Sequence, residues 1–481
     1  MSKKTFSKPF MPPNQVKSLM DSGTTQFRYV HRVVDRDTDS ILLHDVSLDM
    51  LPLAGGPSPS MYKALTQPIL QDLSRDARFL IDYYEHGICP HIMLLDNTRN
   101  PYRYMMPLIG TSKGVVNAIM AVAACRLAHS RLGYPVFSGL EHQATVDDPM
   151  SQMTFYSVQY KQRALKYLSE SLKGPREGAE DSILAIVVLL MLLEYFESGA
   201  GSWTTHLEGA KALLDAREKH SNTRPPQLFR NMVDEVVIFD IFGSTLVRPE
   251  SLTHSIITRL PMGAGDDLAS LTCVGCPMEI LRSIDFVTYK RRVWSKHTPS
   301  TAITEILQEL GALQATLLRI NEFDIEAWIH EVAGAAIQGF PISQETLAHL
   351  CKVWKHSAGV YTSRVLYQLT GDASDLSPLL NGLIMELKCL EAETNVIKFL
   401  LWPIFLAGAE STRVDHREWI LKVLDRLWDS TFIASSKNAA FVLTTLWAKQ
   451  DLKRQQLRSD EPKLWDWMTE LLSLDCHWLF V

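Results

Sequence analysis

Residues 183–193 read Ile-Leu-Ala-Ile-Val-Val-Leu-Leu-Met-Leu-Leu and form the longest uninterrupted apolar run in the chain. This run of eleven residues falls well short of the about 20 residues that a helix needs to cross the hydrocarbon of a membrane. A helix that is apolar on nearly every face is typical of the centre of a large core. We therefore expect a helix from near Asp181-Ser182 to about Gly199, covered by neighbouring helices, and no membrane segment.

The segments on either side of this run carry helical start and stop signals. Asp148-Pro149 combines an N-cap residue with proline at the first helical position, and Gly174-Pro175 ends the same segment. A further helix begins near Ser202, where Gly209 and Ala210 predict a close helix approach. The short connections predict antiparallel packing. Apolar residues at three-and-four spacing make the segment after Pro149 an amphipathic helix: Phe155, Val158, Ala164, Leu165, Leu168 and Leu172.

Helical periodicity extends through most of the chain. Upstream, Thr111-Ser112 caps an alanine-rich segment that runs to Gly133. No strand-and-turn rhythm separates the downstream segments, so we predict an all-α fold, a large multi-helix domain of stacked antiparallel helical hairpins over residues 61–481. Residues 1–60, which end in the Pro- and Gly-rich stretch 52–60, are expected to form a flexible N-terminal segment. The downstream helices are expected at about 278–297, 301–319, 343–369, 377–399, 417–429, 436–457 and 462–473.

The composition is that of a folded protein with a small acidic excess. The chain has 481 residues, of which 46% are hydrophobic and 21% charged, so wholesale disorder, collagen and coiled coils are excluded. Its 48 basic and 54 acidic residues give a net charge of −6, which lacks the positive field of a protein that is mainly a nucleic-acid binder. Seven scattered cysteines form no disulfide framework and favour a reducing compartment. The first ten residues lack the apolar core of a signal peptide, so we expect no secretion.

Motifs for catalysis and metal binding are missing from the sequence. It contains no HExxH, no GxSxG, no phosphate loop and no EF-hand spacing. Gly263-Ala-Gly265 lacks a third glycine and a leading strand, and is expected to be a loop. Cys273 and Cys276 form the only CxxC pair, and with Pro277 following and no second ligand pair, a reduced pair near a helix start is favoured over a zinc or redox site. We predict no enzyme activity and no catalytic, cofactor-binding or metal-binding residues.

Three polar features each have a functional and a structural interpretation. Lys290-Arg291-Arg292 and Lys296, beside Tyr289 and Trp294, could bind phosphate, but cations in the last turn of a helix also complement its dipole, and we favour the latter. His206 on an apolar helix face is more often a hydrogen-bonded histidine at the core edge than a ligand. Acidic pairs are expected at solvated helix starts and not in acid/base catalysis; they are Asp147-Asp148, Asp266-Asp267 and Glu391/Glu393.

An ordered set of motifs runs from about residue 80 to 475. It starts with the alanine-rich segment 115–128 and a Tyr-x-x-x-Ala-Leu-x-x-Leu element at 160–168. A Leu-rich segment with an acidic and aromatic end follows at 189–197, and then Trp-x-x-His-Leu-x-Gly-Ala at 203–214. The later elements are Tyr361–Tyr367, Leu401–Glu410 with Trp-Pro-Ile-Phe-Leu-Ala-Gly-Ala-Glu, Arg413, Arg417, Leu446-Trp447 and Trp465–Trp467. In this order the motifs resemble the fungus-specific transcription factor domain, which is the helical domain of fungal zinc-cluster regulators.

The resemblance implies a transcription regulator in the fungal nucleus that controls metabolic or secondary-metabolite genes. Its helical domain would relay a signal or mediate protein contacts, with a DNA-binding partner protein or the transcription machinery as partners and a small-molecule effector of unknown identity between helices. The alternative is a helical protein-interaction scaffold without a transcriptional role. An enzyme with a non-standard site is the least favoured hypothesis.

The sequence departs from this family in one respect. Such regulators carry six N-terminal cysteines that hold two zinc ions, whereas the first cysteine here is Cys89. We therefore expect this chain to lack the zinc cluster, and its DNA-binding residues are unknown. Action through a partner, a shortened gene model and DNA binding by other means stay open as explanations.

Overall fold

The structure, a computed structural model, describes ten stretches of the chain. They are residues 73–97, 100–132, 149–173, 180–220, 225–259, 271–296, 303–335, 342–371, 376–456 and 465–481. The chain divides into two compact units, Met1–Gly56 and Pro57–Val481, and every described residue belongs to the second. The predicted boundary between residues 60 and 61 lies outside the described residues and stays a prediction.

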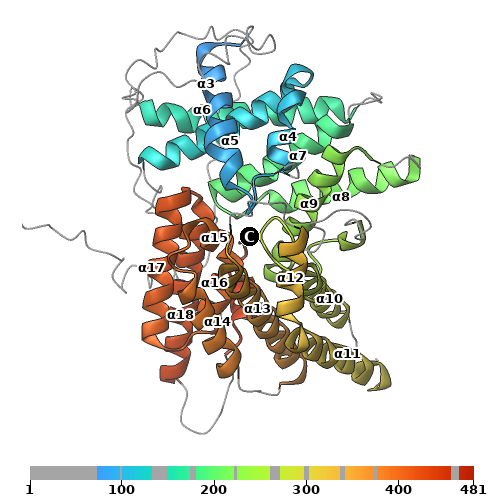
Figure 1. The fold of residues 1–481 in the computed structure, drawn as a ribbon, viewed down its shortest axis with the longest axis vertical. Helices are drawn as coiled ribbons and strands as arrows, with labels where there is room; N and C mark the ends of the chain where they lie inside the picture. Colours follow the sequence, from blue (N-terminus) through green and yellow to red (C-terminus); the bar gives the residue numbers. More distant parts are fainter. Residues whose placement is uncertain are drawn as a thin grey trace, which may run out of the picture. The chain divides into compact units, whose positions relative to one another are not determined.

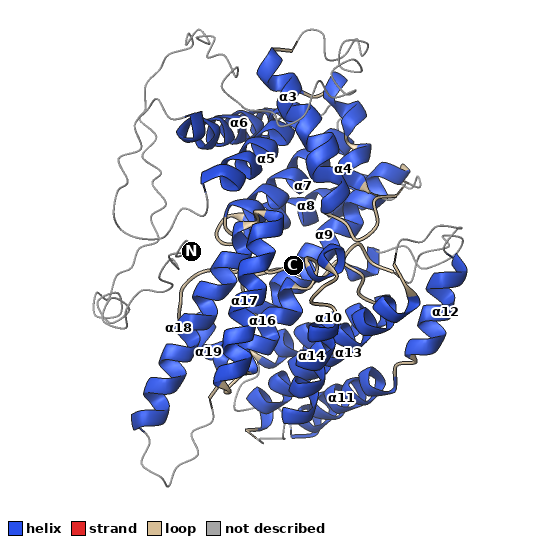
Figure 2. Cartoon of the chain, turned by 60° about the vertical axis from the view of Figure 1, so that its left-hand side comes forward, coloured by secondary structure: helices blue, strands red, loops and turns tan. Residues whose placement is uncertain are grey.

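These ten stretches are helical and contain no β-strand, which confirms the predicted all-α class (Figure 2). None of their helices is long and apolar enough to span a bilayer. In the first half the α-helices are α3 (Arg75–Tyr83), α4 (Pro101–Tyr104), α5 (Lys113–Leu132), α6 (Pro149–Ser171), α7 (Glu180–Glu197), α8 (Trp203–His220) and α9 (Gln227–Leu246). The second half holds α10 (Met278–Trp294), α11 (Ile303–Glu322), α12 (Ile325–Ala335), α13 (Gln344–Thr370), α14 (Ser377–Cys389), α15 (Thr394–Ile397), α16 (Leu401–Glu410), α17 (Val414–Thr431), α18 (Ala434–Gln456) and α19 (Trp467–Leu472).

The apolar run at 183–193 lies in α7 and is buried, as predicted. Every residue from Leu184 to Phe196 is buried, because α5, α6, α8 and α9 pack against α7 (Figure 1) and α18 contacts it as well. The helix ends at Glu197, and Gly199 adopts the left-handed conformation (φ 62°) as its backbone N–H bonds back to the Glu194 carbonyl at 2.8 Å. A side chain at this position would collide with the backbone carbonyl of Leu479, 2.6 Å from the position of its Cβ. Glycine is therefore required here.

Helix α6 begins at Pro149 as predicted, but most of its predicted apolar stripe does not face the core. Phe155, Val158, Leu165 and Leu172 are exposed, with Phe155 at 61% and Leu172 at 57%. The buried face instead carries Met153, Ser157, Tyr160 and Ala164. Two of these, Ser157 and Ala164, are small, and α6 lies close against the alanine-rich α5, where the Ser157 hydroxyl donates to the Ala121 carbonyl at 3.0 Å. Local periodicity therefore identified the helix and not its buried face.

The close helix approach predicted at Gly209 occurs at a different glycine. Gly209 is exposed and has open space where a Cβ would lie, although Ala210 is buried. The close contact involves Gly243 of α9, where a Cβ would lie 2.3 Å from Cη2 of Trp203. Trp203 starts α8 and is fully buried. The bulky ring thus takes the space that the missing side chain leaves.

Three helix pairs are antiparallel hairpins, as their side-chain contacts demonstrate. Glu180 at the start of α7 pairs with Arg217 near the end of α8. Asp425 near the end of α17 pairs with Lys437 at the start of α18. The start of α13 likewise lies beside the end of α14, where the Nδ1 of His349 is 2.5 Å from a carboxylate oxygen of Glu386. This arrangement agrees with the predicted stacked hairpins.

Some downstream elements differ from the prediction. Helices α9 and α12 were not expected, and the segment expected at 377–399 is two helices, α14 and α15. The break follows Leu390, where the Glu391 carboxylate accepts a 2.7 Å hydrogen bond from Nε1 of Trp419 and pairs with Arg426, both in α17. Of the segment expected at 462–473, the described residues 465–473 contain the short α19. Tertiary contacts, and not local propensity, set these ends.

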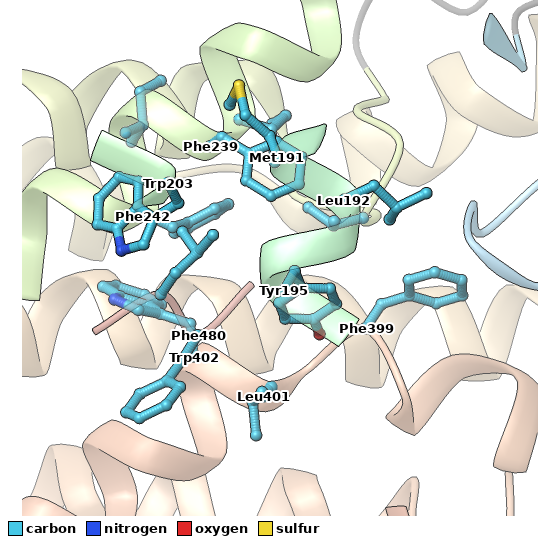
Figure 3. Packing of buried hydrophobic residues seen from close by; sticks show 14 of the residues in the cluster. Met191, Leu192, Tyr195, Trp203, Phe239, Phe242, Phe399, Leu401, Trp402 and Phe480 are labelled. Carbon is cyan, nitrogen blue, oxygen red and sulfur yellow. The ribbon is translucent and has the colours of Figure 1, made fainter. Parts of the chain in front are cut away.

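Aromatic side chains join the two halves of the helical unit (Figure 3). Phe242 of α9 lies 5.2 Å from Trp402 of α16 and 5.3 Å from Trp354 of α13, between ring centroids. The segment 474–481 runs into the same region, where the Leu479 N–H donates to the Gly199 carbonyl at 2.6 Å. Phe480 packs against Phe405 at 4.8 Å. The residues around this junction come from positions far apart in the chain, so only the folded state brings them together.

Candidate functional site

Several polar residues of the sequence motifs lie inside the helical unit and contact one another or a residue of a neighbouring helix. They form three groups: one between α6, α7 and α8, one between α8 and α9, and one between α13, α16 and α19. In each group, the paired side chains come from different helices and hold those helices together. They are the strongest candidates for residues with a role beyond packing.

The first group centres on Lys161 of α6. Its Nζ lies 2.8 Å from Oε1 of Glu194 and 2.6 Å from Oε2 of Glu197, both on α7. His206 of α8 faces the same carboxylate, with Nε2 3.9 Å from Oε1 of Glu194. Glu194 and Glu197 are three residues apart, so a helix presents both on one face. One cation thus bridges two carboxylates in a largely buried site.

Burial and charge act in opposite directions on these groups. Burial alone would lower the pKa of Lys161, but the charges of Glu197 and Glu194 and their hydrogen bonds outweigh it and raise that pKa. Burial raises the pKa of Glu197, and the nearby Lys161 cation offsets part of this rise. Burial lowers the pKa of His206, and Glu194 opposes the shift. His206 lies at the core edge as predicted, but the expected hydrogen bond is not formed at its Nε2, which faces Glu194 at 3.9 Å.

The second group holds the loop after α9 against α8. Lys211 is 1% exposed, and its Nζ lies 2.8 Å from Oδ1 of Asp240 and 3.1 Å from Oε1 of Glu208. The other oxygen of Asp240 accepts the backbone N–H of Ile256 at 3.2 Å, and Glu208 accepts that of Thr253. The sequence does not predict the pairing of Lys211 with Asp240. The only available signal was a lysine between apolar positions of the motif at 203–214.

The third group links the late motifs. Arg364 of α13 donates from Nε to Oε1 of Glu410 at 2.7 Å and also binds its second oxygen. Nε1 of Trp467 donates to the same Glu410 carboxylate at 2.7 Å. Nearby, the guanidinium of Arg417 lies 5.2 Å from the ring centroid of Trp447. Residues from the motifs at 361–367, 401–410, 446–447 and 465–467 therefore meet around α16.

A single family model spans this whole arrangement. The model of the fungal specific transcription factor domain matches residues 78–481, which includes all three groups. The chain belongs to this family. It is also 23% identical over 428 residues to the acriflavine sensitivity control protein acr-2 of Neurospora crassa, covering 82% of this chain and 66% of the relative. The chain thus spans about two thirds of that relative's length. No solved structure matches it.

The basic cluster in this fungal transcription factor domain is largely used within the protein. Lys290 pairs with Glu309 of α11 at 2.6 Å, and Arg291 is buried and donates to the Thr245 carbonyl at 3.1 Å. Arg292 donates to the Thr253 carbonyl, and only Lys296 of the four is exposed and has no ion pair in the described part of the chain. These contacts favour the interpretation of the cluster as cations at a helix end, and not as a phosphate-binding patch.

The cysteine pair of the domain lies at the start of α10. The turn from Thr272 to Cys276 closes through the Thr272 hydroxyl, which accepts the Cys276 N–H at 2.9 Å, and Pro277 occupies the N-cap position of the helix. Cys276 is buried, and burial raises its pKa well above the ordinary thiol value. Neither cysteine forms a disulfide in the described part of the chain, and the reduced state of the pair stays a prediction. Gly263–Gly265 and the pairs Asp147-Asp148 and Asp266-Asp267 lie outside the described residues.

The charged side chains of the three groups are paired across helices, so their arrangement supports the positioning of those helices. Removal of one partner from such a buried pair is strongly destabilising, because the other charge stays buried without compensation. Glu391, predicted at a solvated helix start, instead binds Trp419 and Arg426. Across the described stretches, one group of three metal-binding side chains lies within reach of a single ion, and it is outside these motifs: His349, Glu386 and Cys389.

Proposed function

We propose that this protein is a transcription regulator that acts in the nucleus and controls metabolic or secondary-metabolite genes. The observation that carries the proposal is the match of the fungal specific transcription factor domain to residues 78–481, which include every described helix but part of α3. The name of the Neurospora relative, a sensitivity control protein, supports a regulatory role. Fold alone does not determine function, so the argument rests on the family and not on the helical architecture.

The helical domain acts, in this proposal, by transmitting a signal between its two halves. Three features support it: the aromatic junction around Phe242, the insertion of residues 474–481 beside Gly199, and the buried ion pairs that fix the relative positions of helices. Packed interfaces of this kind have discrete arrangements, so a ligand or partner that prefers one of them shifts the population. The domain contacts DNA-binding partner proteins or the transcription machinery, since the net charge is −6 and most of the one basic cluster is occupied.

The decisive experiment compares a deletion strain with one complemented by the tagged full-length chain. We expect nuclear fluorescence and a discrete set of transcripts that changes on deletion and returns on complementation. Growth on acriflavine tests the role suggested by the relative's name, and we expect the deletion to change sensitivity. Unchanged transcripts and unchanged growth under every condition, with the tagged protein outside the nucleus, would overturn the proposal.

The second candidate is a protein-interaction scaffold without a transcriptional role, and one observation favours it. Four apolar side chains on α6 are exposed, Phe155, Val158, Leu165 and Leu172, and they repeat at helical spacing along one side of the helix, as in helices that bind a partner. Leu165→Glu would release a partner bound at this stripe, whereas Lys166→Glu, on the next exposed position, serves as the control. Loss of a co-purified partner with an unchanged transcript set would favour the scaffold over the regulator.

A further inference from the structure

Three side chains of different ligand type meet where the start of α13 lies beside the end of α14. His349 is in the second turn of α13, and Glu386 and Cys389 are in the last turn of α14. A nitrogen of His349, a carboxylate oxygen of Glu386 and the sulfur of Cys389 all lie within 4.8 Å of one another. The spacing of three residues on α14 places Glu386 and Cys389 on the same face. The antiparallel pairing then brings His349 to that face.

The donor atoms suit one class of metal ion. Imidazole nitrogen, carboxylate oxygen and thiolate sulfur are the three ligand types that Zn²⁺ uses in proteins, at about 2.0–2.3 Å. A thiolate disfavours Mg²⁺ and Ca²⁺, which prefer oxygen ligands. Three protein ligands leave the fourth tetrahedral position for water or an external ligand. The carboxylate and thiolate together would neutralise the charge of a divalent ion.

The three side chains differ in their exposure, so the site has one ligand that is held in place and another that is open to solvent. The Glu386 side chain is only 6% exposed, so its carboxylate is held at the helix interface, and His349 is 23% exposed. Cys389 is exposed, whereas the six other cysteines are buried or half-buried. An ion can therefore reach the thiol from solvent and complete its coordination at the anchored carboxylate.

The nearby positive charge that would oppose a bound metal ion is that of Lys352, whose side chain is flexible. Nδ1 of His349 is 2.5 Å from Glu386, and these two atoms would have to separate by about 1 Å to coordinate one ion with tetrahedral angles. Lys352 lies 3.7 Å from the other carboxylate oxygen and is 39% exposed, so it can turn into solvent. His356, one helical turn further along α13, also senses the charge of Glu386 but packs against Gly382.

From these contacts we infer that His349, Glu386 and Cys389 form a zinc-binding site that links the start of α13 to the end of α14. The site is separate from the motif groups and does not rest on the proposed function. Zinc binding there stabilises the hairpin, because the folded hairpin brings together ligands that the unfolded chain keeps apart.

The test uses the purified full-length chain, kept metal-free in a phosphine reductant and titrated with Co²⁺ and then Zn²⁺. We expect one Co²⁺ per chain, a near-ultraviolet thiolate-to-cobalt band, displacement by Zn²⁺ and a higher melting temperature with Zn²⁺. Cys389→Ser removes the band and weakens Zn²⁺ binding more than about tenfold. Cys476→Ser, a half-buried cysteine elsewhere, is the matched control and retains both.

Two further variants separate metal binding from general effects on folding. Lys352→Ala removes the competing cation, so we expect Zn²⁺ to bind about two- to fivefold more tightly. His349→Ala weakens Zn²⁺ binding more than about tenfold, while far-ultraviolet circular dichroism of the metal-free variant stays unchanged. No thiolate band in the wild-type chain, a band that survives in Cys389→Ser, or equal loss in Cys476→Ser would overturn the inference.

Discussion

The contact between Gly243 and Trp203 leads to a sharp prediction about a single methyl group. Gly243→Ala places a Cβ 2.3 Å from Cη2 and 2.6 Å from Cζ3 of Trp203, well inside the about 3.5–4.0 Å of a normal carbon contact. The ring cannot move away easily, because Trp203 is fully buried and its Nε1 donates to the His477 carbonyl at 2.9 Å. The substitution therefore overpacks the junction between α8 and α9.

The magnitude follows from two opposing terms. Overpacking costs about 1–3 kcal/mol, and the very short distance places this site at the upper end, about 3 kcal/mol. Alanine is favoured over glycine in a helix by about 1 kcal/mol, which leaves a net loss of about 2 kcal/mol. The matched control is Gly209→Ala in α8, where no atom lies within 4 Å of the added Cβ. There only the propensity term acts, so we expect a gain of about 1 kcal/mol.

Equilibrium unfolding in urea, followed by the helical circular dichroism signal, measures both changes. We expect the midpoint of Gly209→Ala above wild type and that of Gly243→Ala below it. In a Trp203→Phe background the smaller ring leaves room, so the loss from Gly243→Ala should shrink. The reasoning is refuted if Gly243→Ala unfolds at or above the wild-type midpoint, or if its loss is the same in the Trp203→Phe background.

Three further predictions concern the buried charges. Lys161→Met leaves two carboxylates without their cation and should lower the free energy of unfolding by about 3 kcal/mol at neutral pH. This loss should shrink in acid as Glu197 takes up a proton. A loss that does not depend on pH would contradict this prediction. Burial lowers the pKa of His206, so the unfolded state takes up its proton first as the pH falls below about 6.5, and wild type loses stability there. His206→Gln should reduce the dependence of the urea midpoint on pH. An unchanged slope of midpoint against pH would argue against this. Arg364→Lys removes a bidentate contact and should cost about 1–3 kcal/mol. Arg413→Lys, in an exposed pair, should leave the melting temperature close to that of wild type, because solvent screens such a pair. Equal thermal stability of these two variants would contradict the expected difference.

Helices with strong local signals could be predicted from the sequence. Pro149 marked the start of α6 and the hydroxyl of Ser112, which accepts the Val115 N–H at 3.3 Å, the start of α5. Helix α9 was missed because it is buried along most of its length and its residues 236–239 read Val-Val-Ile-Phe. Such a run has no polar face to show a helical period, and β-branched residues favour strands.

The site residues divide in the same way. The motif order pointed to the family, and each motif could be placed on a helix, but a pattern in one segment cannot reveal a partner in another. Lys161 and Glu194 are 33 positions apart, and Arg364 and Trp467 are further still. The group of His349, Glu386 and Cys389 follows no sequence spacing that signals a metal site, because two helices supply its ligands.

The sequence by itself determined the all-helical class, the buried position of residues 183–193 and the family, since these depend on local periodicity, run length and motif order. Only the tertiary structure decided which face of α6 is buried, which glycine accepts a close neighbour and which charges are paired. Those properties depend on the shape of a second helix: the alanine-rich α5 lies close to Ser157 on the buried face of α6, and the ring of Trp203 fills the space at Gly243. Complementarity between surfaces is a property of the packed pair and is not written in either segment alone.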